Sequence, residues 1–199
     1  IRQRYSSVWI VGSVGRGGPM QGRQEPADGA GGTVMASALE VFAHASANYG
    51  KPSFNLQTVE VDGTSYPVTE AIVLHKPFGN LLHFSHLGLA KDAPRLLIVA
   101  PMSGHHATLL RGTVEALLPD HDVFITDWTD ARHVPVSKGQ FNLDDYIAYV
   151  MEFVRLLGPD VHLLAVCQPA VPVLVAASLL AQHKDPAQPR SMTLMAGPI

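Results

Sequence analysis

The sequence predicts an α/β domain with a mostly parallel sheet, and two features of its second half carry this prediction. From residue 95 onward, short apolar runs alternate with longer segments of helical periodicity. Strands that alternate with helices are typical of parallel sheets, in which each helix crosses over between two strands. The run at 161–166 is also almost wholly apolar, as expected of a strand buried on both faces.

The composition is that of a globular protein. The chain has 199 residues, of which 47% are hydrophobic and 16% charged, enough for one domain with a sizeable core. Its net charge of −3 gives no electrostatic reason to expect a nucleic-acid partner. A single cysteine excludes an internal disulfide framework and is compatible with a reducing cytosol. No secretory signal is visible.

Residues 1–32 are expected to lie outside the fold. Eight glycines fall in 12–32, and such a composition does not bury a core, which predicts a flexible segment. The domain is therefore assigned to 33–199. A capping box at 37–40 opens a short helix, and Asp62-Gly63 between alternating runs predicts an antiparallel hairpin ahead of the parallel sheet.

The second half contains four predicted strands and three predicted helices. The strands are at 96–100, 122–126, 161–166 and 191–196, and the helices are at 107–118, 142–157 and from 171 onward. Asn142 is the predicted N-cap of the second helix. Ligands bind outside the carboxyl ends of parallel strands, so three loops are expected to gather there: 102–106, 127–140 and 167–169.

The only cysteine, Cys167, falls on the turn between the strand at 161–166 and the next helix. A side chain on such a turn is pushed out at the carboxyl end of the sheet. The helix N-terminus behind it favours the thiolate, which is the reactive form. The backbone N–H of Gln168 would face an oxyanion forming on an attacked carbonyl. This is the geometry of the nucleophile elbow of α/β-hydrolases, usually written Gly-x-Ser-x-Gly.

The local pattern Ala165-Val166-Cys167-Gln168-Pro169 departs from that motif, because Cys replaces Ser and both glycines are missing. A buried structural thiol is one alternative, since free cysteine is among the most buried residue types. A membrane span over 161–181 is another. Two prolines and Gln168 within that segment argue for a soluble core instead.

The loop after the strand at 96–100 is expected to complete the site. A backbone N–H of Met102 or Ser103 would converge with that of Gln168, because an α/β-hydrolase places its second oxyanion donor there. His105 and His106 are assigned to substrate or loop hydrogen bonding, with a base role and a metal pair as alternatives. Adjacent residues do not share a face well, so no metal site is predicted.

Asp127 and Trp128 are further candidates for the lining of the site. Asp127 either supports the site or, as the favoured interpretation, caps a loop or pairs with Arg132. Trp128 either lines an acyl pocket or anchors its loop in the core.

A cysteine nucleophile needs a base, usually a histidine oriented by an acid. In α/β-hydrolases both follow the nucleophile on later strands. Past Cys167 the chain offers only His183 and Asp185, and neither is expected in the right place. The chain also begins with Ile1 instead of Met. We therefore expect a fragment whose C-terminal part is missing.

Four segments together narrow the family: Ala100-Pro101-Met102-Ser103-Gly104-His105-His106-Ala107-Thr108-Leu109-Leu110-Arg111, Thr126-Asp127-Trp128-Thr129-Asp130-Ala131-Arg132, Leu143-Asp144-Asp145-Tyr146 and Val166-Cys167-Gln168-Pro169. The set resembles the intracellular polyhydroxyalkanoate (polyhydroxybutyrate) depolymerases. The resemblance covers most of the chain, from about Thr33 to the last residue.

The resemblance implies an incomplete α/β-hydrolase fold and hydrolysis of ester bonds in amorphous storage polyester, on granules in the bacterial cytoplasm. The nucleophile of that family corresponds to Cys167, and Cys-Gln-Pro is what the family shows. Polymer or granule surface is the implied partner, and no cofactor is implied. The downstream acid and histidine of the family have no counterpart here, so the chain is expected to be inactive alone.

Two alternative functions remain open for this chain. A polyhydroxyalkanoate synthase is related in fold and also uses a cysteine, but its elbow ends in glycines where Pro169 stands here. An inactive granule-binding fragment is the alternative outside enzyme chemistry, and it predicts polymer binding that Cys167→Ala leaves unchanged.

Overall fold

The computed structural model describes residues 37, 39–41, 50–102 and 106–197. The chain divides into two units, 1–49 and 50–199, and the fold described below belongs to the second. At the predicted capping box, residues 37 and 39–41 are helical. The segment 1–32 lies outside the described residues, so its assignment as flexible stays a prediction.

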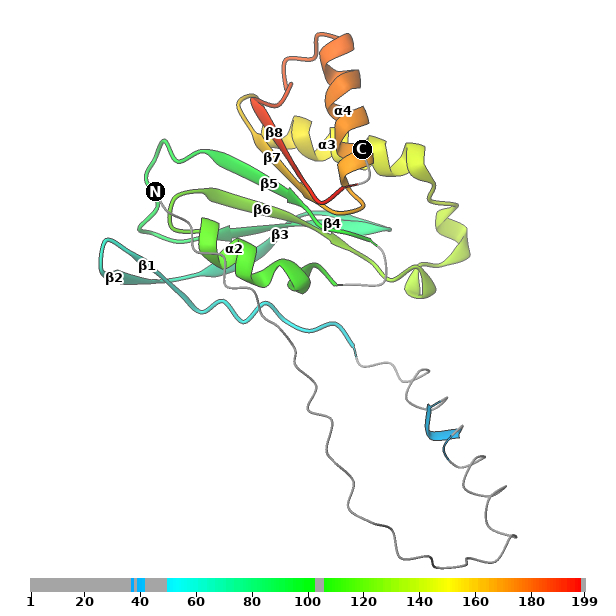
Figure 1. The fold of residues 1–199 in the computed structure, drawn as a ribbon, viewed down its shortest axis with the longest axis horizontal. Coiled ribbons are helices and arrows are strands. Elements are labelled where there is room, and N and C mark those ends of the chain that lie inside the picture. The colour runs from blue at the N-terminus through cyan, green and yellow to red at the C-terminus, as the bar shows by residue number, and fades with distance from the viewer. Residues whose placement is uncertain (1–36, 38, 42–49, 103–105, 198–199) are drawn as a thin grey trace, which may run out of the picture. The chain divides into compact units, whose positions relative to one another are not determined.

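A six-stranded sheet forms the centre of the second unit, in the spatial order β3-β4-β6-β5-β7-β8 (Figure 1). Its strands are β3 (Thr69–Lys76), β4 (Gly79–Ser85), β5 (Arg95–Val99), β6 (Asp122–Trp128), β7 (His162–Val166) and β8 (Ser191–Met195). β4 is antiparallel to both β3 and β6, whereas β6, β5, β7 and β8 run parallel. The parallel part confirms the predicted sheet.

A separate hairpin precedes the sheet, with β1 (Thr58–Val61) antiparallel to β2 (Thr64–Pro67). Asp62 and Gly63 form the predicted turn with φ of 49° and 78°, and a two-residue type I′ turn requires positive φ at both positions. The apolar residues that alternate after this turn, at 66–73, are divided between two sheets instead of forming one strand, because β2 and β3 belong to different sheets. The division falls after Pro67, which has no N–H to donate to a ladder.

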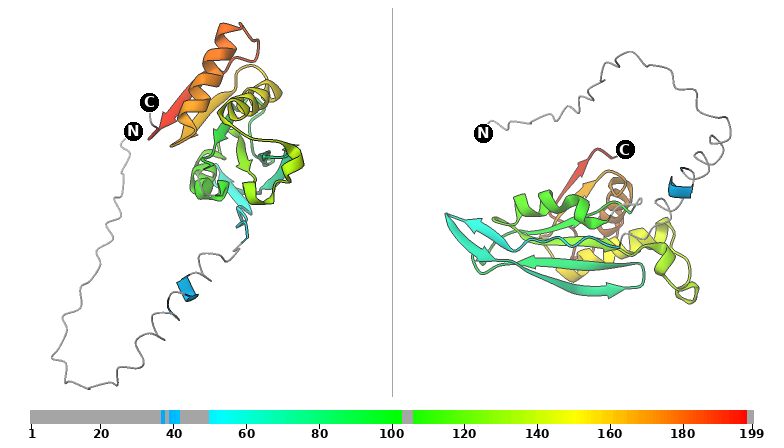
Figure 2. Two further views of the ribbon diagram at one scale, coloured as in Figure 1. Left: turned by 90° about the vertical axis from the view of Figure 1, so that its right-hand side faces the viewer. Right: turned by 90° about the horizontal axis from the view of Figure 1, so that it is seen from below.

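Helices cover both faces of the sheet (Figure 2). On one face lie the 3₁₀ helix η1 (Ala107–Leu110) and α2 (Arg111–Leu117), and on the other lie α3 (Leu143–Leu157) and α4 (Ala170–Gln182). The predicted helix at 107–118 therefore begins as a 3₁₀ turn. Asn142 caps α3 as predicted, and Asp145 completes a capping box with it.

Each face of the sheet carries its own hydrophobic core. The core under α3 and α4 includes Leu97, Phe153 and Leu163, and the core under α2 includes Ile98 and Val114, all at most 1% exposed. Neighbouring residues of β5 thus pack into opposite cores, as the alternation of side chains along a strand requires. The central strands are held from both sides and give the loops at their ends a rigid base.

The order in which successive parallel strands are added to the sheet reverses at β5. From β5 the chain passes through α2 to β6 on one side, and from β6 it passes through α3 to β7 on the other side of β5. Ligands in open α/β sheets bind outside the carboxyl ends of the strands at such a reversal. The loop that begins at Ala100 and the turn that holds Cys167 both lie at this edge.

Candidate active site

Cys167 lies on the turn between β7 and α4 with a φ of 68°. This left-handed conformation costs a non-glycine residue about 1 to 2 kcal/mol. The N–H of Cys167 donates to the carbonyl of Met195 across 2.7 Å, and its carbonyl accepts from the N–H of Ala170 across 3.1 Å. Cys167 is exposed. The alternative of a buried structural thiol is therefore wrong, and the residue stands on a strained strand-to-helix turn.

A glycine outside the Gly-x-Ser-x-Gly motif, Gly197, makes room for this turn. Gly197, just past β8, packs so closely that an added Cβ would lie 2.1 Å from the Cβ of Ala170 and 3.1 Å from the carbonyl oxygen of Cys167. Pro169 is the N-cap of α4 at φ −60°, the value that its ring fixes. The close backbone approach that glycine permits is thus supplied at Gly197, and the proline fits without strain.

Met102 lies beside this turn, because β5 and β7 are parallel neighbours with Val99 opposite Ala165. The N–H of Met102 donates a 3.0 Å hydrogen bond to the side-chain oxygen Oε1 of Gln168. The backbone N–H of Gln168 has no hydrogen-bond partner among the described residues. The structure therefore brings Met102 and Gln168 together, with the amide of Met102 occupied by the Gln168 side chain.

Ala100, two residues before Met102, is fixed through both of its backbone polar groups. Its N–H donates to Oγ1 of Thr126 across 2.9 Å. Its carbonyl accepts from Nε1 of Trp128 across 2.8 Å and from the hydroxyl of Tyr146 across 3.4 Å. Burial raises the pKa of Tyr146 well above its usual range, so the phenol keeps its proton. These contacts hold the strand end from which the Met102 loop departs.

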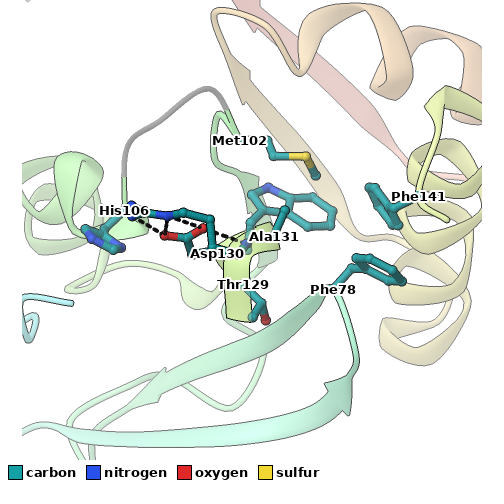
Figure 3. Close-up of a pocket in the computed structure, with 9 residues that line it drawn as sticks. Phe78, Met102, His106, Thr129, Asp130, Ala131 and Phe141 are labelled. Atoms are coloured by element: carbon teal, nitrogen blue, oxygen red, sulfur yellow. Dashed lines mark hydrogen bonds and ion pairs between the residues drawn. The ribbon is translucent and has the colours of Figure 1, made fainter. Parts of the chain in front are cut away.

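A cavity of about 590 Å³ adjoins Met102 at this edge of the sheet. Its wall is apolar in one part and polar in another, and is formed by Phe78, Met102, His106, Trp128, Thr129, Asp130, Ala131, Arg132 and Phe141. Figure 3 shows Phe78, Phe141 and Met102 at one end and His106 and Asp130 at the other. Aromatic walls with a few polar groups are typical of small-molecule sites.

Trp128 combines the two roles that the sequence left open, since it lines the cavity and is also buried in the core. Its ring packs edge-on against Tyr146 with centroids 4.5 Å apart. Gly79 on the adjacent strand β4 allows this position, because an added Cβ there would lie 2.7 Å from the indole. Trp128 therefore forms a rigid wall of the cavity.

Asp127 does not pair with Arg132, and that prediction is wrong. Successive residues of β6 face opposite sides of the sheet, so Asp127 points away from Trp128. Its carboxylate is buried and forms an ion pair with Lys51. Along β6 the cavity wall begins at Trp128, so Asp127 is not part of it. Arg132 instead pairs with Asp130 across 2.6 Å.

Asp130 and Arg132 give the cavity a charged rim. The hydrogen bonds from Arg132 lower the pKa of Asp130 to about 2, and the same contact raises the pKa of Arg132. Both side chains are consequently ionised at neutral pH. Asp130 also caps the short 3₁₀ helix η2 (Ala131–His133) by accepting from the N–H of Arg132. Exposed pairs of this kind contribute little to stability, so their effect is to fix the polar edge.

Of the three predicted site residues in the loop after β5, the structure describes His106 but not Ser103 or His105. His106 lies in the cavity wall and is half-buried. Ser103 and His105 lie outside the described residues, so the assignments of Ser103 as the alternative oxyanion donor and of His105 to substrate or loop hydrogen bonding stay predictions. Phe78 and Phe141 were missed as cavity residues. The signal for Phe78 was its place in the turn between two strands, next to a glycine.

Two further features of the described part of the chain bear on the sequence predictions. No group of three or more His, Cys, Asp or Glu side chains within it is placed to hold a metal ion. None of its helices is both long and apolar enough to cross a bilayer. The apolar segment 161–181 consists of β7 and the greater part of the 13-residue α4, which rules out a single membrane-spanning helix there.

No protein-family model matches the sequence, and no curated protein matches it. Solved structures that resemble it include a membrane phospholipase A described as a bacterial virulence factor, at 15% identity and a TM-score of 0.50 over 86% of this chain and 46% of that one. An α/β-hydrolase from the metagenome of Lake Arreo, Spain, is 14% identical, at 0.48 over 83% and 51%. The carboxylesterase CesB from Bacillus subtilis is 14% identical, at 0.46 over 83% and 50%.

The chain has the α/β-hydrolase fold. Its parallel sheet, the strained residue on the turn between β7 and α4, and the loop after β5 beside that turn are the features that define this class. The chain spans about half the length of the solved structures that it resembles.

Proposed function

We propose that this chain carries the nucleophile of an enzyme that hydrolyses ester bonds in intracellular polyhydroxyalkanoate, with Cys167 forming a hydroxyacyl thioester. In this proposal the hydrolysis takes place on polymer granules in the bacterial cytoplasm. The observation that carries it is the left-handed φ of Cys167 on an exposed strand-to-helix turn, with the Met102 loop beside it. Residues held in strained backbone conformations cluster at active sites, and this one lies on the exposed turn where the fold places a nucleophile.

The choice of an ester rests on the fold and the cavity. The similar structures include a phospholipase and a carboxylesterase. The apolar end of the cavity, at Phe78 and Phe141, suits the aliphatic part of a hydroxyacyl unit. The hydroxyl of Thr129 and the charged rim suit its oxygen atoms. The polyester substrate rests on the Cys-Gln-Pro elbow and on the other segments that resemble the depolymerases.

In the proposed reaction, the sulfur of Cys167 attacks the ester carbonyl carbon, and the carbonyl π electrons move to oxygen. The backbone N–H groups of Gln168 and Met102 stabilise this oxyanion. When the oxyanion collapses, the carbon–oxygen ester bond breaks and the leaving alkoxide takes up the proton that the thiol gave up. The products are a thioester on Cys167 and the free hydroxyl end of the polymer. Water then hydrolyses the thioester to a hydroxy acid and regenerates the thiol.

A single-turnover experiment tests this proposal without requiring the hydrolysis of the thioester. The protein is mixed with the p-nitrophenyl ester of 3-hydroxybutyrate, and the release of p-nitrophenolate is followed. We expect close to one equivalent per protein chain, and a mass increase on the peptide that contains Cys167. Release that is the same in Cys167→Ala would overturn the proposal.

A comparison of acyl groups tests the substrate class. The cavity of about 590 Å³ is expected to accept a 3-hydroxybutyryl group better than a palmitoyl group, presented as p-nitrophenyl esters below the micelle concentration. Faster acylation by the long chain would favour a lipase over a polyester hydrolase.

A further inference from the structure

The side chain of Gln168 occupies a position that the proposed reaction reserves for substrate. Its Oε1 accepts the 3.0 Å hydrogen bond from the N–H of Met102, one of the two donors assigned to the oxyanion. An amide oxygen resembles an ester carbonyl oxygen in its size, its planar carbon and its lone pairs. The resting site therefore holds an internal substitute for the substrate carbonyl at one of its two donors.

The register between β5 and β7 brings Met102 and Gln168 close enough for this hydrogen bond. Val99 and Ala165 are direct partners on the parallel strands β5 and β7. Met102 lies three residues beyond Val99 (102 − 99 = 3), and Gln168 lies three residues beyond Ala165 (168 − 165 = 3). The two loops advance equally from paired positions, so a side chain of glutamine length spans the gap between them. The fixed carbonyl of Ala100 keeps the Met102 end in place.

We propose that Gln168 is a displaceable cap on the oxyanion site, whose side-chain oxygen occupies the N–H of Met102 in the free protein and leaves when substrate enters. This inference rests on the proposed function. Gln168 is exposed, so its amide is solvated by water as soon as it is released. The hydrogen bonds of Ala100, two residues before Met102, hold the end of β5 independently of Gln168.

When substrate enters, the Met102 N–H exchanges the Gln168 oxygen for a substrate oxygen, and this exchange affects the rate of acylation. Replacing the glutamine oxygen with a neutral ester oxygen exchanges two similar hydrogen bonds, so substrate binding gains little. Replacing it with an oxyanion gains a charge-assisted bond, which is roughly twice as strong as a neutral one. The donor therefore contributes mainly in the transition state, where an interaction raises the rate of the chemical step.

Gln168→Met is the variant that tests the cap, because methionine has nearly the length of glutamine and lacks a strong acceptor. Without the cap, the free protein loses a hydrogen bond, whereas the substrate complex and the transition state lose nothing. The net value of one hydrogen bond corresponds to a factor of about two to ten. In the single-turnover assay with the p-nitrophenyl ester, we expect the half-saturating ester concentration to fall by that factor while the maximal acylation rate stays the same.

Gln168→Glu is expected to strengthen the cap where Gln168→Met removes it, since a carboxylate is a stronger acceptor of the Met102 N–H than an amide oxygen. We expect a higher half-saturating concentration at pH 7, and a return toward the wild-type value as the pH falls and the new carboxyl is protonated. Alkylation of Cys167 by iodoacetamide involves no oxyanion, so its rate is the control for thiol reactivity. This rate is expected to be equal in wild type and Gln168→Met, and lower at pH 7 in Gln168→Glu, where the new carboxylate disfavours the thiolate.

The exchange rate of the Met102 amide proton, followed by NMR, reports the cap directly. We expect about two- to tenfold faster exchange in Gln168→Met. A slower maximal acylation rate in this variant would show that the side chain serves only to position the loop, and equal constants would show that it has no role. Either result overturns the cap. A wild-type protein that fails to be acylated at Cys167 overturns the proposed function itself.

Discussion

Nε1 of Trp128 donates a 2.8 Å hydrogen bond to the carbonyl of Ala100, which joins a wall of the aromatic cavity to the strand end that leads to Met102. Ala100 is fully buried and Trp128 nearly so. The second side-chain donor to this carbonyl is the Tyr146 hydroxyl, at the longer distance of 3.4 Å.

Trp128→Phe is therefore expected to destabilise the protein by about 1 to 3 kcal/mol, because a buried acceptor loses its better partner. The free energy of unfolding in urea measures this. Tyr146→Phe is the matched comparison and is expected to cost less, since a 3.4 Å bond is long for a hydroxyl donor. A larger loss in Tyr146→Phe than in Trp128→Phe would contradict this assignment of the two bonds.

The pH dependence of stability is expected to reflect the buried phenol of Tyr146. Burial raises its pKa in the folded protein above the value of 10.0 that it has when exposed. In the unfolded chain the phenol ionises first, so the folded state holds more protons above pH 10 and loses stability as the pH rises. The contribution is fully present below pH 10.

The difference between wild type and Tyr146→Phe isolates this contribution. Urea midpoints measured at pH 8 and at pH 10.5 are expected to show a smaller advantage of wild type over Tyr146→Phe at the higher pH. An advantage that grows between the two values would mean that the phenol ionises more easily in the folded protein.

The strain at Cys167 predicts an unusual order of stabilities among its variants. Its φ of 68° is unfavourable for any residue with a Cβ and neutral for glycine. Cys167→Gly is thus expected to be about 1 kcal/mol more stable than Cys167→Ala, although glycine elsewhere weakens a fold. Urea denaturation of the two variants measures the difference, and greater stability of Cys167→Ala would argue against a strained turn.

Gly197→Ala is expected to cost about 1 to 3 kcal/mol, because the new Cβ would lie 2.1 Å from that of Ala170 and force a backbone shift. Removing the opposing methyl in Gly197→Ala/Ala170→Gly should recover part of this loss. Gly112→Ala is the control, since α2 has open space at Gly112 and alanine favours the helix. Equal effects at both glycines would show that the contact with the elbow is unimportant.

Much of the parallel sheet was predictable because β5, β6 and β7 are short apolar runs with polar boundaries. Cys167 was identifiable for the same reason, since the turn follows once the strand and the helix are placed. The run at 66–73 was harder. Alternation indicates which side of a strand is buried but not which sheet the strand joins, and two sheets share this run.

The finer contacts of the site depend on distances between segments that the sequence does not encode locally. The bond from Met102 to Gln168 joins residues 66 positions apart and follows only from the register of β5 and β7. Asp127 was misassigned because Arg132 is near in sequence, whereas Lys51, its actual partner, is 76 positions away. Phe141 reaches the cavity only through the path of the loop after β6.

A covalent adduct at Cys167 tests the central claim most directly. The protein is incubated with a soluble oligomer of 3-hydroxybutyrate, quenched in acid, digested and mapped by tandem mass spectrometry. The proposed function predicts a 3-hydroxybutyryl or oligomeric acyl group on the Cys167 peptide, sensitive to neutral hydroxylamine as a thioester is, and none in Cys167→Ala. An unmodified Cys167 that iodoacetamide still alkylates, or an acyl group on another residue, would contradict it.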